Sequence, residues 1–219
     1  MDDFQKTDDT RSSSLRLHFP EDEGKYPWLS MLLDAYAIID EGVAVAVKAE
    51  EDELNTKLAC REGCDNCCRF QGDIPLYPLE LIGISWFATE KVTGPRRATL
   101  KEQLAIHGEG DPCPFLLSGS CSIHLLRPVA CRQFNVFYEP CDEGEDPYFT
   151  RRDDVLTPMQ NYTDRAFSAM LPFYGIPDGA DETRAVKNII QTQALNLQSF
   201  DWKNLVKIME DFDSRNSES

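Results

Sequence analysis

Cysteine density is the feature that most constrains this chain. Four cysteines fall within nine consecutive residues, 60–68, in the order Cys-x3-Cys-x2-Cys-Cys, and four more follow over 113–141. A Cys-x2-Cys turn can direct two sulfurs at one tetrahedral ion, about 2.3 Å from each. Thiolates favour zinc, copper(I) and iron–sulfur clusters over magnesium or calcium. The sequence therefore predicts a metal site whose ligands are Cys60, Cys64, Cys67, Cys68, Cys113, Cys121, Cys131 and Cys141.

Two alternatives to metal binding stay open for the cysteines. Unpaired cysteine is among the most buried residue types, and a role as a small core side chain suits an isolated member such as Cys141. It suits Cys64, Cys67 and Cys68 poorly, because charged residues surround them. The second alternative is a redox-active dithiol at Cys64 and Cys67, although no βαβ pattern surrounds this pair.

The charge and hydropathy of the chain limit its partners and its location. Its 219 residues carry a formal net charge of −16. Nucleic acids and anionic membranes are therefore unfavourable partners, because both attract basic surfaces. The first residues lack the basic start and apolar run of a secretory signal, and no apolar run approaches the ~18 residues that would span a bilayer. We expect a cytoplasmic protein, in which thiols stay reduced and disulfides are rare.

Hydrophobic residues that recur every three or four positions predict a mainly α-helical fold. Between residues 28 and 58 this spacing indicates one or two helices, directly before the first cysteine run. We expect that run to be a loop, with a turn at Gly63 and the Asp65-Asn66 pair. Prolines and a glycine over 111–132 forbid a long helix there, and few segments alternate with the period of a strand. We expect a helical domain around an irregular cysteine-rich metal-binding centre. Further helices are predicted over 79–87, 95–107, 159–171, 181–198 and 200–212.

The two ends of the chain differ from its middle in composition. Residues 1–25 are rich in Asp, Glu, Ser and Thr with few apolar positions, which predicts a flexible acidic N-terminal arm. Residues 213–219 have a similar composition and are predicted to form a flexible C-terminal tail. Residues 26–212 between them are predicted to form a single helical metal-binding domain.

Charge does not decide which metal is bound. A four-thiolate zinc site and an oxidised four-iron cluster held by four thiolates both carry a net charge of about −2. Either group needs nearby cations or N–H donors. His124 follows Cys121 by three residues, but a lone histidine is more often packed or hydrogen-bonded, so it stays outside the predicted ligand set. Four arginines stand beside cysteines in the sequence, and we expect them to lie near the sulfurs and offset this charge: Arg61, Arg69, Arg127 and Arg132.

The same residues resemble the family of zinc- or iron-chelating cysteine-cluster (CxxCxxCC) proteins. The family pattern of a cysteine run, Cys-Pro-Phe-Leu, Cys-x-Ile and Arg-Pro-x-x-Cys-Arg is met at residues 60–68, 113–116, 121–123 and 127–132. The resemblance covers about residues 58–134 and implies that up to eight cysteines bind metal together, without implying a defined activity. Flagellin lysine methylases look like relatives with a similar cluster. His124 stands where the family usually has Tyr, which leaves the sulfur set intact.

Three functions are compatible with this pattern. The first is a structural role, in which the free energy of metal binding becomes free energy of folding. The second is an iron–sulfur redox or methyl-transfer enzyme, because Cys60-x3-Cys64-x2-Cys67 matches the three-cysteine signature of radical S-adenosylmethionine enzymes. Those enzymes place the motif on a βα barrel, and Cys68 would crowd the open iron. The third is metal storage or delivery to an unidentified protein partner, which the acidic surface would steer.

We favour a metal-binding protein that chelates zinc or iron, with an iron–sulfur cluster as one form of the iron. Its role is structural or metal-handling. The sequence assigns no catalytic residue and does not decide whether the protein is an enzyme.

Overall fold

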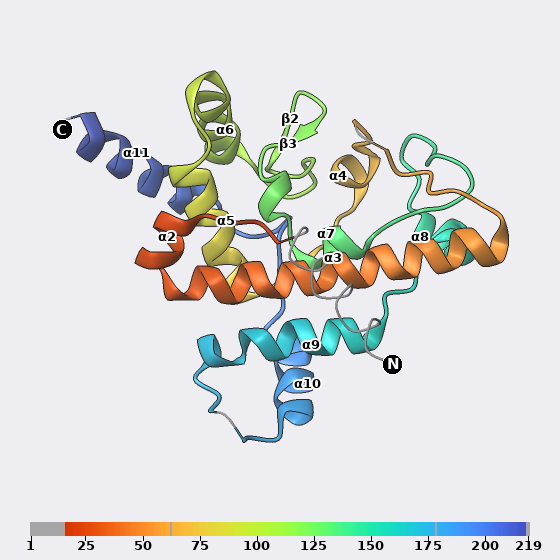
Figure 1. Cartoon of the computed structure of the whole chain (residues 1–219). Helices are drawn as coiled ribbons and strands as arrows, with labels where there is room; N and C mark the ends of the chain where they lie inside the picture. The colour runs from red at the N-terminus through yellow and green to blue at the C-terminus, as the bar shows by residue number, and fades with distance from the viewer. Residues whose placement is uncertain (1–15, 62, 178, 218–219) are drawn as a thin grey trace.

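The computed structural model describes residues 16–61, 63–177 and 179–217, and within them the fold is mainly helical, as predicted (Figure 1). The strands are two residues long and pair only in twos. The α-helices are α2 Pro20–Lys25, α3 Pro27–Leu54, α4 Asn66–Phe70, α5 Pro78–Glu90, α6 Gly94–Ile106, α7 Val129–Gln133, α8 Pro147–Thr150, α9 Gln160–Met170, α10 Glu182–Thr192 and α11 Lys203–Ser217. The 3-10 helices are η1 His124–Leu126, η2 Arg152–Asp154 and η3 Leu171–Tyr174, and the strands are β1 Pro75–Leu76, β2 Leu116–Leu117, β3 Ser120–Cys121 and β4 Leu195–Asn196.

Helix α3 is the axis of the fold and confirms the helix predicted within 28–58 (Figure 1). It begins with a proline at its first position, where no helical N–H bond is lost, and ends at Asn55 in the left-handed conformation. Helix α9 packs along one side of α3, and a Cβ on Gly42 would lie 2.6 Å from the Cβ of Tyr162 on α9. This close approach of the two helices requires glycine at position 42.

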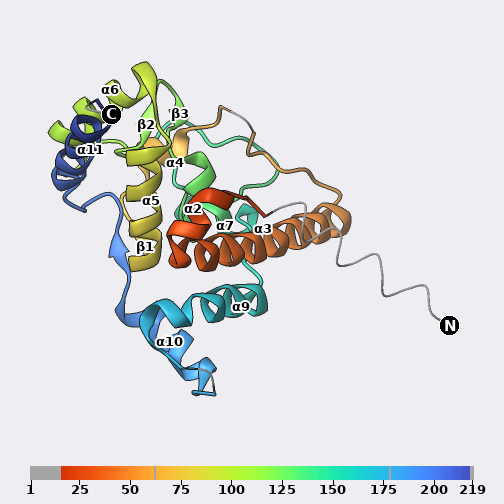
Figure 2. The ribbon, with the colours of Figure 1, turned by 60° about the vertical axis from the view of Figure 1, so that its left-hand side comes forward.

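Helices α5, α6 and α11 form a second helical group at one end of α3 (Figures 1 and 2). Helix α11 packs against both α5 and α6, although it comes last in the chain. Trp202, just before α11, lies edge-on to Phe115 with 4.8 Å between ring centroids, and both side chains are fully buried. The C-terminal part of the chain therefore shares a core with the segment that carries Cys113.

Two short antiparallel pairs connect distant parts of the chain. Strand β1 pairs with β4, with Leu76 opposite Leu195, and so ties the segment before α5 to the C-terminal part. Strands β2 and β3 form a hairpin whose two loop residues, Ser118 and Gly119, both have positive φ. Positive φ at both positions is typical of a two-residue type I′ hairpin turn, which glycine favours. Cys121 ends this hairpin.

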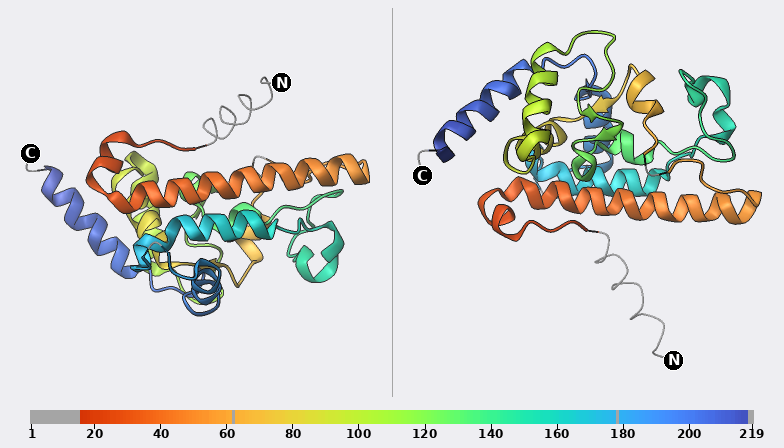
Figure 3. Two further views of the ribbon diagram at one scale, coloured as in Figure 1. Left: turned by 60° about the horizontal axis from the view of Figure 1, so that its bottom comes forward. Right: turned by 90° about the horizontal axis from the view of Figure 1, so that it is seen from above.

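The ends of the chain differ from the sequence-based expectation. Residues 1–15 lie outside the described part, but residues 16–25 do not continue a loose arm. Helix α2 lies within them, and the ring of Phe19 lies edge-on to Trp86 with 5.2 Å between centroids. Asp22 forms an ion pair with Lys91. At the other end α11 continues to Ser217, so most of the predicted tail is helical (Figure 3).

The other predicted helices agree with the structure except at one end. The helix predicted over 181–198 stops at Thr192, because Leu195 and Asn196 are used in strand β4. Among the described helices, none is both long enough and apolar enough to cross a membrane.

Candidate metal centre

The first cysteine segment leaves α3 and is attached to a later part of the chain by main-chain hydrogen bonds. The N–H of Ala59 donates to the carbonyl oxygen of Val136, with 2.7 Å between N and O. In return the N–H of Val136 donates to Sγ of Cys60 at 3.3 Å. We predicted a loop over this segment, but its end forms the short helix α4, which carries Cys67 and Cys68.

The second cysteine segment lies beside α4. The N–H of Cys113 donates to the carbonyl oxygen of Cys68 at 2.7 Å, although the two residues are far apart in the sequence. Gln103 on α6 holds this segment by donating to the carbonyl oxygens of Pro114 and Leu116, at 2.7 and 3.0 Å. The Cys-Pro-Phe-Leu motif is therefore held by α6 and by the buried ring of its phenylalanine.

Cys131 lies on α7, and the arginine that follows it supports the turn before this helix. Arg132 is only 4% exposed. Its guanidinium donates to the carbonyl oxygens of Leu125 and Arg127 and forms an ion pair with Asp40 on α3. It also lies over the ring of Tyr36, 4.0 Å from the centroid. We expected Arg132 to face the sulfurs. Its contacts instead fix the turn that precedes α7, the helix that carries Cys131.

Glu80 supplies a second buried anchor for α7. Its carboxylate accepts the N–H of Val129 at 2.7 Å and the N–H of Tyr77 at 3.0 Å. It thus satisfies N–H groups at the beginnings of both α5 and α7. Burial raises the pKa of Glu80 to about 7.

The loop that carries Cys141 is held against α4 by one side chain. Asn66 donates through Nδ2 to the carbonyl oxygen of Glu145 at 2.8 Å, and its Oδ1 accepts the N–H of Gly144 at 3.3 Å. The sequence suggested a turn at Asp65-Asn66, but it gave no sign that Asn66 would hold a loop almost 80 residues away.

These attachments gather the eight cysteines into one neighbourhood. All eight are free thiols. The thiol of Cys68 is in hydrogen-bond contact with those of Cys67 and Cys113. Cys131 is an electrostatic neighbour of Cys67, Cys68 and Cys121. Cys141 is likewise an electrostatic neighbour of Cys60 and Cys64.

Crowding and burial make most of these thiols poor acids. Contact with the Cys68 thiol, together with burial, raises the pKa of Cys67. The hydrogen bond with Cys113 raises the pKa of Cys68 to about 12, and burial raises the pKa of Cys141 to about 11. Burial likewise raises the pKa of the Cys60, Cys121 and Cys131 thiols. A metal ion would have to displace protons from these sulfurs.

Three arginines place positive charge beside the thiols. Burial raises the pKa of Cys60 and Cys121, and the charge of Arg127 offsets part of this rise. Arg96, which was not predicted because it lies 25 residues before Cys121, donates to the carbonyl oxygen of Cys121 at 2.8 Å. Arg151, also not predicted, lowers the pKa of Cys141. Of the predicted arginines, Arg127 therefore occupies the expected place.

The other predicted cations and the histidine lie at the edge of this neighbourhood. Arg69 is exposed and forms an ion pair with Asp65. His124 receives a contact from Nη1 of Arg127 at its Nε2, with 2.9 Å between the two nitrogens. Arg69 is also an electrostatic neighbour of Cys68.

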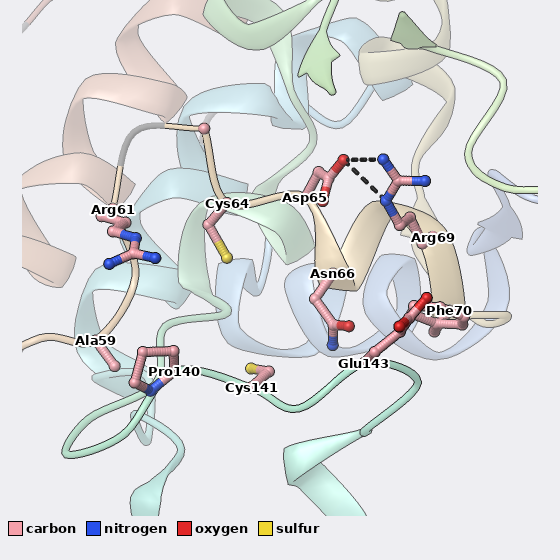
Figure 4. A pocket seen from close by; sticks show the side chains of 11 residues that line it. Ala59, Arg61, Cys64, Asp65, Asn66, Arg69, Phe70, Pro140, Cys141 and Glu143 are labelled. Atoms are coloured by element: carbon pink, nitrogen blue, oxygen red, sulfur yellow. Dashed lines mark hydrogen bonds and ion pairs between the residues drawn. The ribbon is translucent and has the colours of Figure 1, made fainter. Parts of the chain in front are cut away.

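An open pocket of about 530 Å³ borders the thiols (Figure 4). Its walls come from the first cysteine segment and from the loop that carries Cys141. Cys64 and Cys141 both line it, and Cys64 is exposed. Arg61 lies at one side of the pocket, and the ion pair between Asp65 and Arg69 lies at the other.

The thiols are neighbours rather than a completed ligand shell. Within residues 16–61, 63–177 and 179–217, no three Cys, His, Asp or Glu side chains form a group with the spacing of a metal-ion site. The chemistry of the donors nevertheless suits a soft metal ion, because the set consists of reduced sulfurs with arginines around them.

The comparison with protein families decides what this segment is. Residues 59–155 match the model of the family CxxCxxCC, described as "Putative zinc- or iron-chelating domain". This segment belongs to the CxxCxxCC family. The CxxCxxCC domain begins one residue before Cys60 and extends beyond Cys141, so it contains every predicted ligand. A search of curated proteins and a search of solved structures each found no match to the chain.

Proposed function

We propose that this protein chelates zinc or iron through the eight cysteines of its CxxCxxCC domain. The observation that carries the proposal is the gathering of eight free thiols, from four separate segments, into one neighbourhood. A role as core side chains does not account for Cys64, which is exposed, or for the position of Cys64 and Cys141 on a pocket wall. The family description supports metal binding in general.

An unsatisfied polar atom supports the fit between these residues and a thiolate-bound metal. Nε of Arg127 is buried and has no hydrogen-bond partner among the described residues. The same guanidinium is close enough to Cys60 and Cys121 to lower the pKa of both. A buried N–H without a partner costs about 1–3 kcal/mol. Thiolates formed on metal binding would supply negative charge at this donor.

We infer that the role of the metal is structural or metal-handling. Short helices, two-residue strands and loops build the cysteine region, and few main-chain bonds join them. A bound ion would link the segments, so that its binding free energy would stabilise the fold. A cytoplasmic location, which keeps thiols reduced, and a single domain over residues 26–212 are parts of this proposal.

An iron–sulfur redox or methyl-transfer enzyme is the second candidate, and the pocket favours it. A substrate could reach the thiols through the opening lined by Cys64 and Cys141 (Figure 4). An iron–sulfur cluster, when bound, would supply electron transfer there, and Arg61 beside the pocket could pair with an anionic group of a substrate.

Elemental analysis with a visible absorption spectrum, on protein purified without oxygen, tests both candidates. Zinc in a colourless solution supports the structural or metal-handling role. Iron with matching acid-labile sulfide and a brown colour supports the iron–sulfur enzyme. Protein that contains neither metal, and takes up neither on reconstitution, overturns the proposed function.

A further inference from the structure

We propose that the eight thiols form two four-sulfur metal sites that meet at the neighbouring residues Cys67 and Cys68. This inference rests on the proposed function and adds how the sulfurs are shared. The inner site consists of Cys68, Cys113, Cys121 and Cys131. The outer site consists of Cys60, Cys64, Cys67 and Cys141.

Packing against the main hydrophobic core separates the two sets. Among the described residues, the main hydrophobic core includes Cys113 and has three further cysteines packed against it: Cys68, Cys121 and Cys131. These four are the inner set. The outer set lies away from that core, with Cys64 exposed and with Cys64 and Cys141 on the pocket wall.

Contacts within the inner set come from elements that the core holds in place. The main chain of Cys113 is hydrogen-bonded to that of Cys68, and the two thiols are in contact. Cys121 is paired with Leu116 in the hairpin, and Leu116 follows Cys113 by three residues in the sequence. Cys131 lies on α7, whose first N–H, that of Val129, is held by the buried carboxylate of Glu80.

Contacts within the outer set come from loops. Cys60 is an electrostatic neighbour of Cys64 and Cys67, and Cys141 is a neighbour of Cys60 and Cys64. Asn66 bonds the loop of Cys141 to the beginning of α4. The outer sulfurs are therefore held by hydrogen bonds of these segments rather than by packing against the main core.

Helix geometry explains how adjacent cysteines can serve different sites. Successive residues of an α-helix point in directions about 100° apart, since a turn holds 3.6 residues. Cys67 and Cys68 are successive residues of α4, so their sulfurs can point at two different ions while the ions remain neighbours. For one ion to bind both sulfurs, two side chains that leave the helix about 100° apart would have to turn toward the same point.

The arginines are distributed to match two anionic centres. Two four-thiolate zinc sites would carry a total charge of about −4. Arg127 is close to Cys60 of the outer set and Cys121 of the inner set, so it lies between the two sites. Arg96 contacts the inner segment at Cys121, and Arg151 lies near Cys141 of the outer set.

The two sites should differ in how fast they exchange metal. The outer ion borders an open pocket of about 530 Å³, through which water and small chelators can reach it (Figure 4). The inner ion is covered by the hydrophobic core. A chelator should therefore remove the outer ion first.

Zinc-reconstituted full-length protein tests this division. Elemental analysis should find two zinc ions per chain, and a chromogenic chelator should release them in two phases of equal amplitude that differ at least tenfold in rate. Cys64→Ser should leave one ion per chain and abolish the fast phase, while Asp65→Asn, its neighbour without a sulfur, should keep both phases.

Each other result overturns the division. One ion per chain with a single release phase, in protein that still binds metal through its cysteines, contradicts two sites but leaves the proposed function in place. Loss of both ions in Cys64→Ser indicates one joint cluster. Protein that binds no zinc and no iron contradicts the proposed function itself.

Discussion

The main-chain N–H of Cys113 is hydrogen-bonded to the carbonyl oxygen of Cys68, with 2.7 Å between N and O. This bond joins the two cysteine segments through the backbone, so their approach does not depend on a metal alone. Their thiols are also in contact. The bond explains how a domain with two cysteine regions about 45 residues apart can present one set of sulfurs.

Replacing Cys67 with serine should reduce the bound metal and lower the melting temperature. Cys67 is a neighbour of Cys68 in the first cysteine segment and of Cys131 in the second. The loss of its sulfur should therefore weaken metal binding at either position. Asp65→Asn is the matched control, because it breaks an exposed ion pair worth at most about 1 kcal/mol. Unchanged metal content and melting in Cys67→Ser would remove this residue from the site.

Replacing Arg127 with glutamine should weaken metal binding more than it weakens the apo fold. The guanidinium offsets thiolate charge near Cys60 and Cys121, and its Nε has no protein partner to lose among the described residues. We expect about a tenfold loss of zinc affinity in a competition titration, the lower end of the range for groups that support metal ligands. Equal affinity in the variant and the wild type would show that Arg127 does not balance the charge of the site. Arg184→Gln, at an exposed arginine on helix α10, serves as the control.

Replacing Arg132 with glutamine should destabilise the fold by about 2–3 kcal/mol, because it leaves Asp40 and two loop carbonyl oxygens without their partner. Chemical denaturation measures this change. A double-mutant cycle with Asp40→Asn should give a coupling energy above about 0.5 kcal/mol. Additive effects of the two substitutions would contradict the ion pair.

Replacing Gly42 with alanine should destabilise the protein by about 1–3 kcal/mol without changing its metal content, because the new Cβ would overlap Tyr162 between α3 and α9. Gly24→Ala is the control. It lies in helix α2 with no atom within 4 Å of the added Cβ, so it should be neutral or stabilise by up to about 1 kcal/mol. Equal melting temperatures for the two variants would contradict the close packing of α3 on α9.

Glu80 should make the fold less stable as the pH rises from 5 to 8. Burial raises the pKa of Glu80 in the folded protein from 4.5 to about 7, whereas the unfolded chain has the ordinary value. The folded state therefore binds the proton more tightly. The resulting stability is complete below the unfolded pKa and is lost as the pH passes the folded one, by up to about 3 kcal/mol.

Comparison with Glu80→Gln isolates this effect, because the loss of metal at low pH is common to both proteins. The free energy of unfolding of the wild type, minus that of the variant, should fall between pH 5 and pH 8. A difference that stays constant or rises with pH would contradict the raised pKa.

The sequence was sufficient to predict the long helices. The period of hydrophobic residues predicted α3, α9 and α11, because one buried face repeats with the turn of a helix. The prolines near their starts indicated α5 and α6. The family pattern identified the domain. Helix α4 was missed, because five residues are too few to show a period and because its cysteines were assigned to a loop.

The contacts around the sulfurs could not be predicted, because they depend on distant segments and on side-chain direction. Arg132 follows Cys131 in the sequence, yet adjacent helix residues point about 100° apart, and its guanidinium turns to Asp40 on α3. Arg96 lies on helix α6 and donates to the carbonyl oxygen of Cys121 at the end of strand β3. The pairing of β1 with β4 is likewise long-range, and two-residue strands carry no alternating pattern.

X-ray absorption spectroscopy at the edge of the bound metal, on the wild-type protein purified without oxygen, tests the central claim most directly. The account predicts zinc or iron with a first shell of sulfur atoms at about 2.3 Å. A first shell of nitrogen and oxygen atoms, or protein that holds no zinc or iron even after reconstitution, would contradict it.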